Sequence, residues 1–122
     1  MKIRRIPDPV YLRDVTLVIG TDPELDRWLK KQRATYPEIS TEWYGVNGRF
    51  IATPDKAGRI SRFILVSTKN RGATLTVILG HEVLHLTFSV LQAAGLQLSD
   101  ESDEAFTYYF QSRFAACLRH AR

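Results

Sequence analysis

Residues 73–95 read ATLTVILGHEVLHLTFSVLQAAG, and this stretch decides the fold. Apolar residues occupy positions nearly all round a helical circumference, and Gly95 ends the pattern. The spacing predicts one long helix over residues 73–94 that belongs in the core. Gly80 lies inside this helix at a cost of about 1 kcal/mol relative to alanine, which predicts close approach of a strand or of a second helix.

The centre of the predicted helix carries the motif His81-Glu82-Val83-Leu84-His85. Residues four apart lie on one helical face, so both imidazoles can bind one metal ion while Glu82 stands beside them. Zinc suits imidazole ligands, and with three protein ligands it keeps a fourth position for a water whose pKa falls to about 7. Glu82 would accept the proton of that water. The alternative is an ordinary helix in which these residues carry no chemistry.

The end of the chain predicts another helix, capped by Ser99 or Asp100 and running to about Leu118. Three acids lie near its start: Glu101, Asp103 and Glu104. They are candidates for the third metal ligand, because His120 is the one histidine outside the motif.

Helical geometry places Glu101 and Glu104 on one face of this last helix, while Asp103 joins a stripe of phenylalanines. The face with the two glutamates also carries Ala105, Tyr108, Ser112 and Ala115. Small residues let helices approach closely, so this face is expected to pack against the motif helix. Glu104 is the better candidate because it lies well inside the helix, and Glu101 remains the alternative. Alternatively, either acid would only interact favourably with the positive end of the helix dipole and would bind no metal.

These residues resemble the gluzincin branch of the zincin metallopeptidases, in which a second helix supplies a glutamate ligand after the HExxH helix. The resemblance implies a small zincin-like α+β domain with a short mixed or antiparallel sheet. It implies Zn²⁺ bound by His81, His85 and Glu104, and peptide hydrolysis with Glu82 as the base. Gluzincins often carry an acid where this chain has Tyr108, which could hydrogen-bond a ligand or a developing oxyanion, or simply pack. The run from Glu104 to Tyr108 is also similar to small phage or prophage proteins that bear HExxH.

The residues before the motif predict a sheet. Strands are expected over residues 10–19 and 62–68, and the second is apolar on both faces and hence covered on both sides. Thr21 or Asp22 can cap a helix between them. Residues 40–53 predict a hairpin whose tight turn contains Asn47-Gly48, since this dipeptide tolerates positive φ.

Composition predicts one folded domain over residues 1–122, with 44% apolar and 25% charged residues, as in globular proteins. The N-terminus lacks the apolar run of a signal peptide, and the motif interrupts the longest apolar segment, so we expect a cytoplasmic protein with no membrane partner. The single cysteine, Cys117, leaves His and carboxylate as metal ligands. The net charge of +4 is scattered along the chain, which disfavours a nucleic-acid partner.

The sequence thus predicts a zinc-dependent metallopeptidase acting on a peptide or protein substrate. The alternative is a non-catalytic protein of the same fold, in which the metal stabilises the domain or the domain binds a partner. Glu82 is not needed as a ligand, and its presence favours catalysis.

Overall fold

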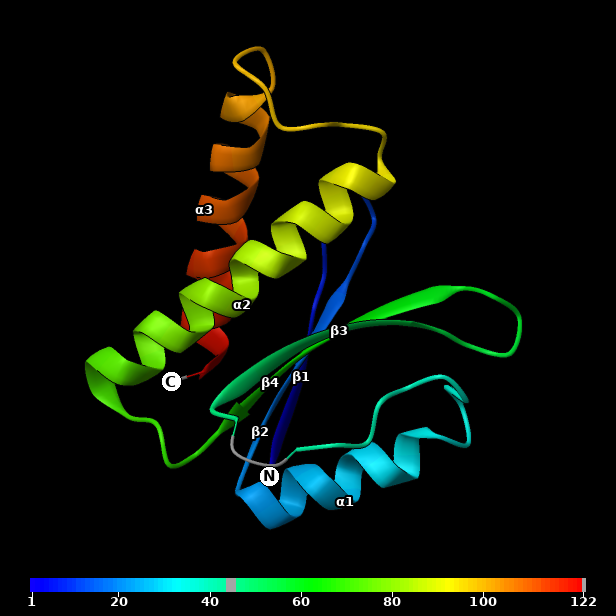
Figure 1. The fold of residues 1–122 in the computed structure, drawn as a ribbon. Helices are drawn as coiled ribbons and strands as arrows, with labels where there is room; N and C mark the ends of the chain where they lie inside the picture. Colours follow the sequence, from blue (N-terminus) through cyan, green and yellow to red (C-terminus); the bar gives the residue numbers. More distant parts are fainter. Residues whose placement is uncertain (44–45, 122) are drawn as a thin grey trace.

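The computed structural model describes residues 1–43 and 46–121, and within them the chain forms an α+β fold (Figure 1). The elements are β1 (Lys2–Ile6), β2 (Val15–Gly20), α1 (Asp22–Gln32), β3 (Gly48–Pro54), β4 (Ile60–Ser67), α2 (Gly72–Ala93) and α3 (Asp103–Ala121). The strands form one mixed sheet in the order β1-β2-β4-β3. The predicted α+β class is confirmed.

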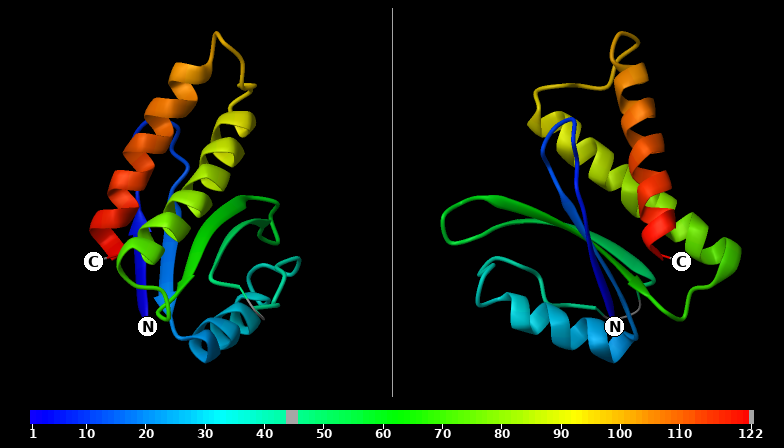
Figure 2. Two further views of the ribbon diagram at one scale, coloured as in Figure 1. Left: turned by 60° about the vertical axis from the view of Figure 1, so that its left-hand side comes forward. Right: turned by 180° about the vertical axis from the view of Figure 1, so that it is seen from behind.

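The sheet has a parallel centre and antiparallel edges. β2 and β4 pair in parallel, while β1 pairs with β2 and β3 pairs with β4 in antiparallel fashion. Helix α1 covers one face, and α2 and α3 cover the other (Figure 2). β4 contributes Ile64 and Val66 to the core under α2 and α3, and Phe63 and Leu65 to the core under α1. The prediction that this strand is covered on both sides is therefore confirmed.

Helix α1 begins where its capping residues predict. The Thr21 hydroxyl accepts a hydrogen bond from the Glu24 backbone N–H at 3.3 Å, and the Glu24 carboxylate accepts one from the Thr21 N–H at 2.9 Å. This capping box satisfies two backbone donors at the start of the helix. Thr21, rather than Asp22, is thus the N-cap.

The strand expected over residues 10–19 is shorter than predicted, and β1 was not predicted. The Asp8 carboxylate accepts hydrogen bonds from the N–H groups of Val10 and Tyr11, which turns the chain before β2 begins at Val15. β1 is an edge strand rich in Lys and Arg. The sequence does not predict β1, because strands are recognised by β-branched and aromatic residues and β1 consists mostly of Lys and Arg.

The predicted hairpin at Asn47-Gly48 is wrong. Residues 40–43 form no strand, and Tyr44 and Gly45, which the hairpin would have included, lie outside the described residues. Gly48 instead starts β3, which turns back into β4 through residues 55–59. There the Asp55 carboxylate accepts hydrogen bonds from the N–H groups of Ala57 and Arg59, and Gly58 supplies φ of 84°. This Asp-based turn is the stronger local signal because its side chain closes the turn.

Helix α2 matches the prediction within one residue at each end, and Gly95 follows it with φ of 87°. The prediction that α2 lies in the core is correct for one face of the helix only, since the side chains of Val77 and Leu84 are 71% and 47% exposed. By length and composition α2 could cross a membrane, but the core helices of soluble proteins pass the same test.

Helix α3 packs against α2 in antiparallel orientation. Phe106, near its start, contacts Phe88 with 5.4 Å between ring centroids, and Phe114, further along, lies against Gly80. A Cβ on Gly80 would stand 3.4 Å from the Phe114 ring, at ordinary van der Waals distance, so α3 packs over Gly80 as predicted but this contact does not require a glycine. The face that packs is nevertheless the phenylalanine stripe and not the Ala/Ser face, because large aromatic side chains gain more from burial than small ones.

Candidate metal centre

The motif residues His81, Glu82 and His85 gather on one turn in the middle of α2. One potential ligand atom from each lies within 4.8 Å of the other two. The Nε2 atoms of the two histidines are 3.2 Å apart, and His81 Nε2 is 3.7 Å from Glu82 Oε1. Two nitrogen ligands on one tetrahedral zinc ion, each at roughly 2.0–2.1 Å, would be about 3.3 Å apart. The separation of the two Nε2 atoms is therefore compatible with one zinc ion, and it is also the length of an N–H···N hydrogen bond between neutral imidazoles.

The three side chains differ in exposure. Both imidazoles are exposed, whereas Glu82 is 5% exposed. Burial raises the pKa of the Glu82 carboxyl, while His81, His85 and a hydrogen bond from the Phe50 backbone lower it. The arrangement leaves the histidine nitrogens accessible from solvent and holds the carboxylate against the protein.

The outer edge of β3, with which no strand pairs in the described residues, borders this site. The Ser67 N–H donates a hydrogen bond to the Asn47 carbonyl. In an antiparallel pair of strands, the backbone groups of Asn47 and of every second residue after it then point toward β4. The backbone groups of Gly48, Phe50 and Ala52 therefore point away from β4, toward the unpaired edge. The Phe50 backbone bonds the Glu82 carboxylate, and the Phe50 ring lies parallel to the His85 imidazole at 6.3 Å.

Gly48 allows α2 to approach this edge. A Cβ at Gly48 would stand 2.5 Å from Ile78 Cγ2 and 3.3 Å from Glu82 Cγ. The first distance is far below van der Waals contact, so no larger residue fits unless Ile78 or the helix that carries it shifts. In the sequence the dipeptide Asn47-Gly48 favours a tight turn, and nothing local distinguishes this from a glycine needed for close packing. Gly48 and Phe50 are thus site residues that sequence reasoning missed.

The structure does not bring Glu104 or Tyr108 to the motif. Glu104 is exposed on the first turn of α3, and the antiparallel packing places it beyond Phe88, past the end of the site. Tyr108 is 66% exposed and lines a cavity of about 330 Å³ with the N-terminal segment around Asp8. Glu101 precedes the helix and is exposed as well. Three of the five predicted site residues are therefore together.

Comparisons of the chain with models of protein families, with curated proteins and with solved structures found no match. Function is therefore inferred from the residues and their geometry.

Proposed function

We propose that the protein is a zinc-dependent metallopeptidase of zincin type, with His81 and His85 as ligands and Glu82 as general base. The observation that supports this most directly is the 3.2 Å separation of the two Nε2 atoms, with a buried carboxylate beside them. An N–H···N hydrogen bond between two neutral imidazoles would have the same length, so the buried Glu82 beside the pair is the feature that an ordinary helix does not explain.

When bound, zinc would polarise the scissile carbonyl and acidify the attacking water. Glu82 would accept the proton of that water, since its carboxylate lies beside the two histidines. The hydrogen bond from the Phe50 backbone holds this carboxylate in place. Proton transfer then depends on the contact between α2 and β3.

The outer edge of β3 is the proposed binding surface for the substrate. Gly48 and Ala52 can offer their N–H and C=O groups to an extended peptide, which would add a strand to the sheet. Phe50 can offer its carbonyl, since its N–H is engaged by Glu82. A peptide bound there would pass beside the motif, because Phe50 lies next to His85.

Glu104 remains the candidate for the third ligand that the sequence favours, with Tyr108 as its neighbour, but the packing of α3 opposes this role. Glu104 lies about 10 Å along α2 from the histidines, at about 1.5 Å of helix rise per residue, and it is exposed. Hydrogen bonds from Tyr109 to Asp8 and from Arg113 to the Pro7 carbonyl hold α3 in this position. The third ligand is therefore the part of the proposal that most needs an experiment.

A second candidate is a metal-binding protein without turnover. It is favoured by one observation, namely that His81, Glu82 and His85 already offer three ligand atoms to one ion without α3. Glu82 would then bind the metal and would not be available as a base. The two candidates predict different third ligands.

Zinc analysis and a peptide assay of the purified protein test the proposal. The wild type should retain about one zinc per chain after dialysis and should cleave components of a broad peptide library, as read by mass spectrometry. The double variant His81→Ala/His85→Ala should lose both properties while remaining folded. Equal zinc content in this variant would exclude the site, and zinc binding without cleavage would favour the second candidate.

A further inference from the structure

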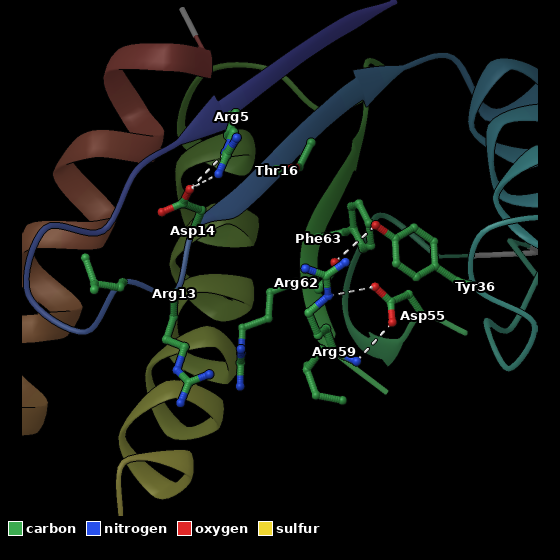
Figure 3. Close-up of a pocket in the computed structure, with 12 residues that line it drawn as sticks. Arg5, Arg13, Asp14, Thr16, Tyr36, Asp55, Arg59, Arg62 and Phe63 are labelled. Carbon is green, nitrogen blue, oxygen red and sulfur yellow. Dashed lines mark hydrogen bonds and ion pairs between the residues drawn. The ribbon is translucent and has the colours of Figure 1, made fainter. Parts of the chain in front are cut away.

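A cavity of about 620 Å³ lies at the end of the sheet where β2 and β4 begin (Figure 3). Its charged lining consists of Arg5, Arg13, Asp14, Asp55, Arg59 and Arg62. Cations therefore outnumber anions in this lining. None of the motif residues on α2 lines it, so the cavity is separate from the candidate metal centre.

The two acids of the lining are already paired. Arg5 donates to the Asp14 carboxylate through Nε at 2.8 Å and approaches it again through Nη2 at 2.5 Å. Arg59 Nε lies 3.5 Å from the Asp55 carboxylate, which also closes the β3–β4 turn. These four residues compensate one another in charge.

Arg13 and Arg62 are the uncompensated pair. Both residues line the cavity, and Figure 3 shows their side chains extending side by side toward α2. Within residues 1–43 and 46–121 neither has an acidic partner. Arg62 is 5% exposed and uses Nε to donate to Ser89 Oγ at 2.9 Å, which leaves both Nη groups without a protein acceptor in the described residues. Burial lowers the Arg62 pKa first, and the charge of Arg13 lowers it further.

Two adjacent guanidinium groups repel each other, and burying one of them costs free energy unless an anion is supplied. In the described residues no carboxylate forms an ion pair with Arg13 or Arg62, although the neighbouring Arg5 and Arg59 are paired with aspartates. Guanidinium groups present parallel N–H donors that match phosphate oxygens, and a dianion would balance both charges. Arg13 is exposed, so the ligand has a route from solvent to the buried Arg62.

We propose that this cavity binds a phosphate dianion, either free phosphate or the terminal group of a phosphomonoester, between Arg13 and Arg62. The Nη groups of Arg62 hold the anion from inside the cavity, and Arg13 closes over it from the solvent side. This site does not depend on the proposed peptidase activity.

Titration of the full-length protein with inorganic phosphate tests the site, by calorimetry at constant ionic strength and at a pH where phosphate is the dianion. The wild type should bind one phosphate saturably, and Arg13→Gln should weaken binding about tenfold, as expected for loss of a charge-assisted contact. Arg27→Gln is the matched control, because it makes the same change at an exposed position on α1 and should leave the affinity unchanged. Arg62→Gln should also weaken binding, and a melting curve establishes whether that variant is folded.

The proposal is overturned if the wild type shows no saturable binding at millimolar phosphate, or if Arg13→Gln and Arg27→Gln weaken it equally. It is also overturned if succinate, a dicarboxylate dianion, binds more tightly than phosphate. Competition with O-phosphoserine distinguishes the two sources. Displacement of phosphate by this compound identifies a phosphomonoester ligand, and failure to displace it identifies free phosphate.

Discussion

The Tyr109 hydroxyl donates a hydrogen bond of 2.9 Å to Asp8 Oδ2, and so joins the last helix to the segment between the first two strands. Both groups are buried, and Asp8 Oδ1 is occupied by the backbone of Val10 and Tyr11. Burial, followed by the contact with Asp8, raises the Tyr109 pKa well above its ordinary range. The hydroxyl therefore remains a donor, and α3 is anchored by a polar contact as well as by its phenylalanines.

Replacement of Tyr109 by Phe should lower the free energy of unfolding by about 1–3 kcal/mol, because it leaves a buried carboxylate oxygen without its donor. Urea denaturation followed by circular dichroism measures the change. Tyr108→Phe removes a hydroxyl from the adjacent, exposed position and should change stability by less than about 0.5 kcal/mol. Equal effects of the two variants would show that the Asp8 contact contributes nothing.

Substitution of Glu104 by Ala should weaken zinc binding at least tenfold, and Glu101→Ala should weaken it less. The basis is the sequence, since Glu104 lies inside the helix at the position that the gluzincin resemblance implies, whereas Glu101 precedes the helix. Competition with a chromophoric chelator gives both affinities. Wild-type affinity in Glu104→Ala would mean that the site is complete without α3, as the second candidate function requires.

Glu82→Gln should leave zinc content and melting temperature unchanged and reduce peptide hydrolysis by roughly 10²-fold or more. Glutamine keeps the size of the side chain and an oxygen acceptor for the Phe50 backbone, but it cannot take the proton. The measurement is the initial rate on a peptide that the wild type cleaves. A variant that holds zinc and turns over at the wild-type rate would exclude Glu82 as the base.

Gly48→Ala should destabilise the protein by about 1–3 kcal/mol, because the new methyl group would overlap Ile78 Cγ2. The Ile side chain is stiff at χ1 and cannot turn away at low cost. Combining the change with Ile78→Ala removes the overlapping atom, so the two effects should be less than additive in a double-mutant cycle. Simple additivity would indicate that β3 and α2 are not in close contact here.

The acid sensitivity of the fold should depend on Asp22. A hydrogen bond from Trp43 Nε1 at 2.9 Å is the largest cause of its lowered pKa, followed by the Ser67 hydroxyl, with Lys69 contributing less. A carboxyl with a lowered folded-state pKa adds stability above its unfolded pKa, and this stability is lost as the pH falls through the folded value. Asp22→Asn should therefore be less stable than wild type near neutral pH, and the two should converge in strong acid. Denaturation midpoints over this pH range provide the test.

Local patterns were sufficient for α1, α2 and β4, where helical spacing, capping residues or a continuous apolar run act within one segment. The motif geometry followed from the same spacing, since residues four apart on a helix must be neighbours. The remaining features depend on contacts between distant segments. Gly48 accommodates a helix that begins more than twenty residues later, and only that helix distinguishes close approach from a turn.

The packing of α3 shows a further limit. Helical geometry correctly separated the phenylalanine stripe from the Ala/Ser face that carries Glu104, but it did not say which of them faces α2. That choice depends on the apolar area that each face can bury against its neighbour. The small residues on the face of Glu104 predict that this face is buried, but the phenylalanines are packed against the core and Glu104 is exposed.

The parallel pairing of β2 with β4 has a consequence for how the chain folds. Each outer pair is local, since β1 meets β2 and β3 meets β4 across short connections. The central pair joins segments that are separated by α1 and all of β3, and closing so long a loop costs entropy before any contact repays it. We therefore expect the two outer pairs to form first as separate units. Their docking, which also buries both cores, would then set the rate at which the native state appears.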